Sequence, residues 1–147
     1  SLNNFWFMSA AATQRKTFAL SMKYILYASP EKLFETLTKE SLISEWCDGG
    51  GKMEPKVDGN FELFDGWVKG KVVVFDPKKK VLSYTWKPGE WDKKTAHSVV
   101  TWQIKPNSAG SEIQLDHTGF PSQEEADKHY DGWIDYVFEP LNDYFIR

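Results

Sequence analysis

The sequence has little of what marks several common classes of protein. Its 147 residues include a single cysteine, Cys47, so no disulfide can form within them, and this suits a reducing compartment. No apolar run reaches about eighteen residues, which argues against a transmembrane helix. Lys and Arg number 18 against 21 Asp and Glu, a balance that is unusual for a nucleic-acid-binding domain. We therefore expect a cytoplasmic protein with no membrane span and no nucleic-acid partner.

Signatures of catalysis and of metal binding are equally scarce. The three histidines, His97, His117 and His129, are not spaced as metal ligands, and Cys47 is distant from all of them. The chain contains no G-x-S-x-G elbow, no P-loop and no dinucleotide-binding fingerprint. The glycines at 49–51 follow a predicted helix and do not open one, so they are not expected to hold a phosphate. We predict no metal site and no cofactor.

Aromatic residues, in contrast, are abundant, with 7 Trp, 6 Tyr and 10 Phe. In a chain of this length, which fits one domain, so many large rings indicate a deep core, an aromatic-lined pocket, or both. Residues 1–15 are expected to be a flexible N-terminal extension. Residues 16–147 are expected to fold as a single domain.

The pattern of residues predicts a strand, two short helices, a run of antiparallel strands and a long C-terminal helix. The first strand is expected over residues 17–28. Ser29-Pro30-Glu31 has the features of a helix start, and Thr38 is predicted to cap a second helix. Six further strands are predicted over residues 52–57, 61–64, 67–75, 81–86, 96–104 and 111–118.

The remaining signals concern turns and the last helix. Asp65-Gly66 is a typical hairpin dipeptide, and residue 55 is a proline, so the strand at 52–57 can lie only at an edge. The helical period runs from Ser122 to Ile146, with Trp133, Val137, Leu141 and Tyr144 on one face and Tyr130, Ile134, Phe138 and Phe145 beside them. Pro140 should interrupt this helix. The order of elements predicts an α+β fold in which a curved sheet grips the helix.

The period-two alternation of the strands identifies the residues that face this helix. They are the candidate ligand-binding residues of a helix–sheet cavity: Phe61, Tyr84, Trp86, Trp102, Leu115 and His117 from the sheet, with Trp133 and Val137 from the helix. The alternative is that these side chains fill the space completely. An inward His117 could act on a ligand as an acid or base, or it could satisfy a local carbonyl group and have only a structural role.

Several segments occur in a familiar order. They are Tyr27-Ala-Ser-Pro-Glu-Lys-Leu-Phe-Glu-Thr-Leu-Thr38, Glu45-Trp46, Gly66 to Asp76-Pro77, Leu82-Ser-Tyr-Thr-Trp86, His117-Thr-Gly-Phe120 and Gly132-Trp133. From about Lys16 onward the chain resembles proteins similar to the C-terminal domain of the heat-shock-protein-90 ATPase activator, in the START-like (polyketide-cyclase/birch-pollen-allergen-like, SRPBCC) superfamily. The resemblance implies a helix-grip fold, with about seven strands around the C-terminal helix and usually a cavity between them.

Three functions are consistent with these observations. The leading hypothesis is non-catalytic binding of a small apolar or amphipathic molecule in the helix–sheet cavity. The resemblance suggests the alternative, a stress-response module that interacts with a chaperone. The activator also has a chaperone-binding N-terminal domain, which we expect this chain to lack, and this weakens the case for direct activation. A third hypothesis is a cyclase-like or hydrolase-like enzyme that uses His117.

Overall fold

The structure, a computed structural model, describes residues 16–147, and the extension predicted over residues 1–15 lies outside this range. One antiparallel sheet of seven strands has the order β1-β7-β6-β5-β4-β3-β2. The strands are β1 (Phe18–Leu26), β2 (Gly51–Met53), β3 (Asn60–Leu63), β4 (Val68–Asp76), β5 (Val81–Pro88), β6 (Ser98–Asn107) and β7 (Gly110–Phe120). The helices are α2 (Pro30–Thr38), α3 (Glu40–Trp46), α4 (Gln123–Trp133), a π-helical turn η1 (Ile134–Phe138) and α5 (Glu139–Phe145).

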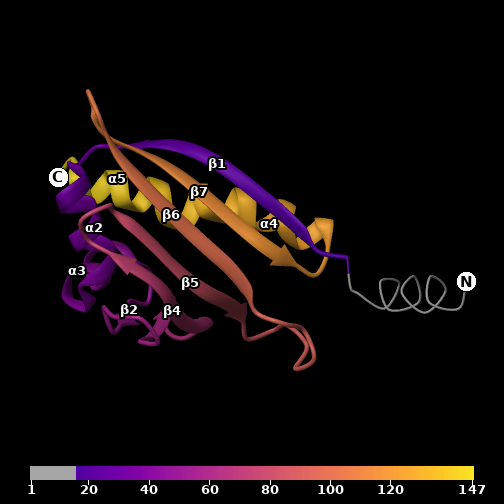
Figure 1. Ribbon diagram of the computed structural model, residues 1–147. Coiled ribbons are helices and arrows are strands. Elements are labelled where there is room, and N and C mark those ends of the chain that lie inside the picture. Colours follow the sequence, from indigo (N-terminus) through magenta and orange to yellow (C-terminus); the bar gives the residue numbers. More distant parts are fainter. Residues whose placement is uncertain (1–15) are drawn as a thin grey trace, which may run out of the picture.

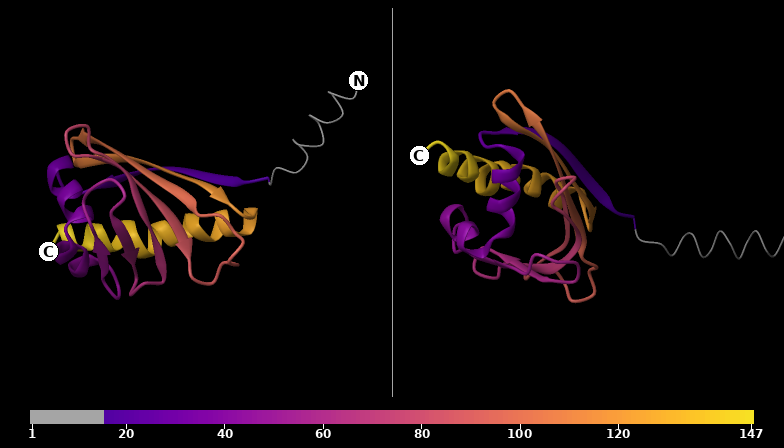
Figure 2. Two further views of the ribbon diagram at one scale, coloured as in Figure 1. Left: turned by 60° about the horizontal axis from the view of Figure 1, so that its bottom comes forward. Right: turned by 60° about the vertical axis from the view of Figure 1, so that its left-hand side comes forward.

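The sheet curves around the long C-terminal helix, as the two views in Figure 2 show. The helix, formed by α4, η1 and α5, runs along the concave side of the sheet, while α2 and α3 lie near its C-terminal end (Figure 1). This is the helix-grip arrangement that the sequence predicts. Within residues 16–147, no helix combines the length and the apolar character needed to cross a bilayer.

The first two helices confirm one predicted cap and correct another. The Ser29 side chain accepts a hydrogen bond from the backbone N–H of Lys32, with Pro30 in the first turn, as predicted. Thr38, however, does not cap α3. Its hydroxyl donates to the carbonyl oxygen of Phe34 at 2.7 Å, so it is already bonded inside α2. The N-cap of α3 is Lys39, which makes no side-chain capping bond.

The predicted hairpin at Asp65-Gly66 forms between β3 and β4. Asp65 and Gly66 have φ angles of 55° and 81°, and the N–H of Trp67 donates to the carbonyl oxygen of Phe64 at 3.1 Å. Two successive positive φ angles are those of the turn that matches the twist of a hairpin. The edge strand is also confirmed, since β2 stands at the end of the strand order beside β3, and it ends before Pro55.

Pro140 interrupts the long helix as expected. A π-helical turn precedes it, in which the N–H of Glu139 donates to the carbonyl oxygen of Ile134, five residues back. Proline has no N–H to give to the carbonyl group four residues earlier, and the wider turn accommodates this loss.

The side chains predicted to face the helix are buried, and this places the core between the helix and the sheet. The predicted helix face needs one correction, because Tyr130 is 46% exposed and the preceding residue, His129, points inward with 9% exposure. The inward stripe of α4 is Ala126, His129 and Trp133, spaced three and four residues apart. Tyr130, one position further along than His129, is therefore turned away from the core.

Candidate functional site

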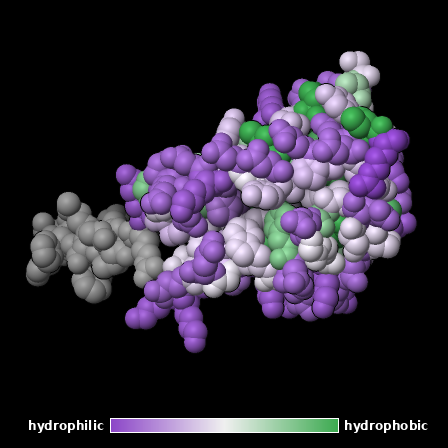
Figure 3. Space-filling model, turned by 180° about the vertical axis from the view of Figure 1, so that it is seen from behind, coloured by the Kyte–Doolittle hydropathy of each residue, from purple (hydrophilic) through white to green (hydrophobic). Residues whose placement is uncertain are grey.

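A cavity of about 220 Å³ lies at one end of the helix–sheet interior. Its walls come from the β3–β4 turn, the end of β5 with the loop that follows, α4 and η1. Five aromatic side chains line it: Phe64, Trp67, Trp86, Trp133 and Tyr136. The other lining residues are Glu90, Glu125, Lys128, His129, Gly132 and Val137. On the side of the molecule where the long helix lies in front of the sheet, apolar residues are exposed in patches among hydrophilic ones (Figure 3).

The β3–β4 turn supplies two of these aromatic walls. Phe64 has a φ angle of 57°, a left-handed conformation that is uncommon for a bulky side chain. The rings of Phe64 and Trp67 meet edge to face at 69°, and Phe64 meets Tyr136 at 76°. Trp67 also stands at 78° to the ring of Trp86. The hairpin therefore positions aromatic walls that are steeply inclined to one another.

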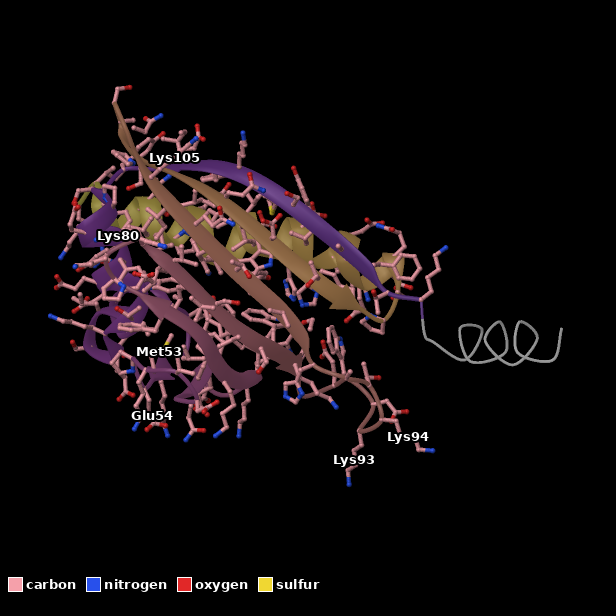
Figure 4. The ribbon with its side chains drawn as sticks, in the orientation of Figure 1. Met53, Glu54, Lys80, Lys93, Lys94 and Lys105 are labelled. Carbon is pink, nitrogen blue, oxygen red and sulfur yellow. The ribbon has the colours of Figure 1, made fainter. Side chains whose placement is uncertain are left out.

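The loop between β5 and β6 supplies the acidic side of the cavity. Its fold is held by the Lys87 ammonium group, which donates to the carbonyl oxygens of Thr95 and Lys93. The indole N–H of Trp91 donates to the Glu125 carboxylate and so ties the loop to α4. Lys93 and Lys94 extend away from the fold at the loop tip (Figure 4), whereas Glu90, earlier in the same loop, lines the cavity.

The helix contributes the remaining wall. The Ser122 hydroxyl accepts a hydrogen bond from the N–H of Glu125 at 3.1 Å and begins α4. Lys128 lies at the rim, where its ammonium nitrogen is 3.2 Å from a Glu124 carboxylate oxygen. At Gly132 a Cβ atom would find no other part of the fold within 4 Å. Gly132 therefore leaves open space beside the cavity.

Two indole groups are buried against two histidines behind this wall. The Nε1–H of Trp86 donates to Nε2 of His129 at 3.1 Å, and Nδ1 of His129 is 2.9 Å from the carbonyl oxygen of Glu125. An indole only donates, so Nε2 of His129 must accept and Nδ1 must carry the proton. Burial lowers the pKa of His129, and the hydrogen bond to the Glu125 carbonyl oxygen partly opposes this shift. His129 is thus a neutral imidazole with both nitrogens bonded.

His117 is held in the same way, but deeper. It is fully buried, and its Nδ1 accepts from the Nε1–H of Trp133 at 3.1 Å. Its Nε2 lies 2.8 Å from the Ser98 hydroxyl, which bonds in turn to the carbonyl oxygen of Trp86 at 2.8 Å. Burial, assisted by His129, lowers the pKa of His117 to about 2. To act as an acid or base, His117 would have to break one of these bonds.

The cavity contains only part of the predicted ligand-binding set. Trp86, Trp133 and Val137 line it, whereas five others are buried outside its lining: Phe61, Tyr84, Trp102, Leu115 and His117. The rings of Phe61 and Tyr84 stack with their centres 3.9 Å apart, and the Trp102 indole donates to the Tyr84 hydroxyl at 2.9 Å. Side chains therefore fill this part of the interior. Ligand binding by these residues stays a prediction.

Most of the cavity wall was not predicted from the sequence. Phe64, Trp67, Glu90, Glu125, Lys128, His129, Gly132 and Tyr136 were not among the predicted site residues. His129 and Tyr136 could have been found, because they lie four residues before and three residues after Trp133. Over residues 16–147, no group of three or more His, Cys, Asp or Glu side chains is placed to hold a metal ion.

Comparison with known proteins identifies the family. The family model described as Activator of Hsp90 ATPase homolog 1-like protein matches residues 27–145. The human protein named Activator of 90 kDa heat shock protein ATPase homolog 1 is 25% identical over 129 residues, which are 88% of this chain but 37% of that protein. The chain thus spans little more than a third of the length of this relative.

Solved structures show the same fold. A Mesorhizobium loti protein matches with a TM-score of 0.75 and 27% identity, covering 88% of this chain and 98% of its own. A Plasmodium falciparum protein described as an HSP90 activator matches with a TM-score of 0.65 and 20% identity, covering 84% of this chain and 90% of its own. By the family match and the shared helix-grip fold, the chain belongs to the family of Activator of Hsp90 ATPase homolog 1-like proteins, in the START-like (SRPBCC) superfamily.

Proposed function

We propose that this domain binds a small apolar or amphipathic molecule in the cavity beside Gly132, without a chemical step. The observation that carries the proposal is an aromatic-lined cavity with a few polar groups at its rim, which is the usual composition of a ligand site. Its volume of about 220 Å³ is below the range of roughly 300–1,000 Å³ for drug-sized ligands. We therefore expect a small molecule, or one part of a larger one.

The walls are well suited to binding because they are already ordered. Among residues 16–147, every buried side-chain nitrogen and oxygen has a hydrogen-bond partner. Trp86 and Trp133 are each held by a histidine, so a ligand would not have to order these two rings. A preformed site loses less conformational entropy on binding.

The test is to place a larger side chain at Gly132, so that it fills the cavity, and to measure ligand binding. A leucine there would occupy the open space, whereas the matched control Gly132→Ala adds only one methyl group. The probe is N-phenyl-1-naphthylamine, a neutral dye that fluoresces in apolar surroundings. We expect the unmodified protein to bind it and to show quenched tryptophan emission. Gly132→Leu should weaken binding at least tenfold, and Gly132→Ala by no more than about threefold.

Two results would contradict the proposal. The first is no binding of the dye by the folded protein at millimolar protein concentration. The second is equal binding by the Gly132→Leu variant, since the dye would then occupy another place. Circular dichroism of both variants shows whether each has folded.

A second candidate function is a chaperone-linked interaction module. What favours it is the family match over residues 27–145, together with the chaperone activators among the related proteins. We propose that this domain contacts an Hsp90-type chaperone. The matched region is 37% of the human relative, so stimulation of the chaperone ATPase is a further step beyond contact.

The two functions can be separated by experiment. Binding to the Hsp90-type chaperone from the same organism can be measured by surface plasmon resonance, and its ATPase rate can be followed in parallel. Saturable binding supports the interaction module, and its absence at high micromolar concentration contradicts it. If Gly132→Leu abolishes dye binding but not chaperone binding, the two functions use different surfaces.

A further inference from the structure

We propose that the cavity selects a small organic cation of the quaternary or methylated ammonium kind. This inference rests on the proposed function, since it names the class of ligand for the same cavity. Three properties of the cavity carry it: the inclined aromatic walls, the carboxylates on both sides of them, and the small volume.

The aromatic walls line one cavity and are steeply inclined to one another, as the sides of an aromatic box are. Phe64, Trp67, Trp86 and Tyr136 meet in three pairs at angles of 69°, 76° and 78°, with ring centres 6.1 to 6.4 Å apart. The faces of aromatic rings carry partial negative charge and attract cations, and such boxes are a known solution for quaternary ammonium groups. Trp67 and Tyr136 are 39% and 61% exposed, so a ligand can reach them from solvent.

Carboxylates flank these rings on two sides. Glu90 and Glu125 line the cavity itself. A neighbouring depression shares Phe64, Trp67 and Tyr136 with the cavity and is bordered by Asp48 and Asp65. Carboxylates therefore border the rings in both depressions, which favours a positively charged ligand.

Among the lining residues within 16–147, Lys128 is the one cation, and its charge is already compensated. The ammonium nitrogen of Lys128 lies 3.2 Å from a Glu124 oxygen and 3.9 Å from a Glu125 oxygen. The hydrogen bond and charge of Glu124 raise the pKa of Lys128, and the charges of Glu125 and Glu90 add to this, so Glu90 lies within electrostatic reach. His129 is neutral and both of its nitrogens are bonded. Three further lysines, Lys69, Lys87 and Lys93, border another depression that shares Trp67, but they do not line the cavity itself.

The decisive test compares ligands of one shape that differ in charge. Choline is the cation, 3,3-dimethyl-1-butanol is its neutral isostere and 3,3-dimethylbutanoate is the anion. Binding is followed by titration calorimetry and by the indole N–H signals in NMR spectra. We expect choline to bind at least tenfold more tightly than the alcohol, and the anion to bind more weakly than both. Added salt should weaken choline binding, because the carboxylates are then screened.

Variants assign the selectivity to the box. Tyr136→Leu removes the ring but keeps an apolar side chain, and it should reduce the preference for choline over 3,3-dimethyl-1-butanol at least threefold. Tyr130→Leu is the matched control, because Tyr130 is an exposed tyrosine on the same long helix that does not line the cavity. Glu90→Gln should likewise weaken choline binding, and Glu31→Gln in the first turn of α2 should not.

The same series separates failure of this inference from failure of the proposed function. If the alcohol binds as tightly as choline, or the anion binds best, the cation inference is overturned while ligand binding stands. If the neutral dye and all three ligands fail to bind, the proposed function itself is wrong. Phosphatidylcholine vesicles distinguish a lipid headgroup from a free cation. We expect no vesicle binding, because the lipid phosphate would lie near Glu90 and Glu125.

Discussion

Acidification should destabilise this protein through His117 well before most carboxylates are protonated. His117 is fully buried as a neutral imidazole, because Nδ1 accepts from the Trp133 indole and Nε2 bonds to Ser98. A proton on Nδ1 would break the bond from Trp133 and leave a buried charge. The folded state therefore resists protonation, and the pKa of His117 is lowered from 6.5 to about 2.

The sign and size of the effect follow from proton linkage. Between about pH 6.5 and pH 2 the unfolded chain binds a proton at His117 and the folded chain does not, so stability falls as the pH falls. The loss approaches about 1.4 kcal/mol per pH unit. From pH 7 to pH 4.5 His117 should therefore cost about 2.5 kcal/mol. The pKa of His129 is also lowered by burial, so its contribution has the same sign.

The assay is urea unfolding, followed by tryptophan fluorescence at pH 7, 6, 5 and 4.5. His117→Gln removes the titrating group and keeps hydrogen-bonding capacity, so it should be less stable at pH 7 but depend less on pH. His97→Gln is the control, because His97 is exposed. If the wild-type protein keeps its stability to pH 4.5, or if His117→Gln retains the full pH dependence, His117 is not a buried neutral imidazole.

Three further predictions test the helix and the core. Trp133→Ala should lower the free energy of unfolding by about 3–5 kcal/mol, because it removes a large buried ring. Trp133→Phe should lower it by about 1–3 kcal/mol, because phenylalanine keeps a ring but leaves His117 without its donor, and no loss on urea unfolding of Trp133→Phe would contradict this bond. Gly132→Ala should raise stability by about 0.5–1 kcal/mol through helix propensity, and a lower melting temperature would show that the added methyl group clashes. Burial raises the pKa of the Cys47 thiol to about 11. The thiol should therefore react slowly with a disulfide reagent at pH 8 in the native protein and quickly once urea is added. Fast reaction of the native protein would show that the Cys47 thiol is not buried.

Local signals were sufficient to predict most of the fold. The cap at Ser29-Pro30, the hairpin at Asp65-Gly66 and the interruption at Pro140 depend on one or two residues and their own backbone geometry. Strand alternation identified the inward faces because a side chain's face depends only on its parity along the strand. These features need no knowledge of distant parts of the chain.

The cavity could not be predicted in the same way. Its walls combine Trp67 from a hairpin turn, Glu90 from a long loop and Glu125 from the last helix, and only the tertiary fold brings them together. The alternation of side chains along each strand predicts which residues face the helix, but it does not predict whether side chains fill the space between helix and sheet. Trp102 and Tyr84 close one part of it by bonding to each other, and Gly132 leaves another part open.

The buried histidines connect the core to the cavity. Trp86 and Trp133 line the cavity, and their N–H groups could be buried only because His129 and His117 accept from them. Both bonds require neutral imidazoles, and burial favours the neutral form by lowering the pKa of His117 and of His129. His117, which from sequence was a candidate for acid–base chemistry, and His129 thus hold the rings that shape the cavity. In the ligand-binding function that we propose, these polar groups would keep the cavity ordered, and recognition would fall to the aromatic faces and the carboxylates at the rim.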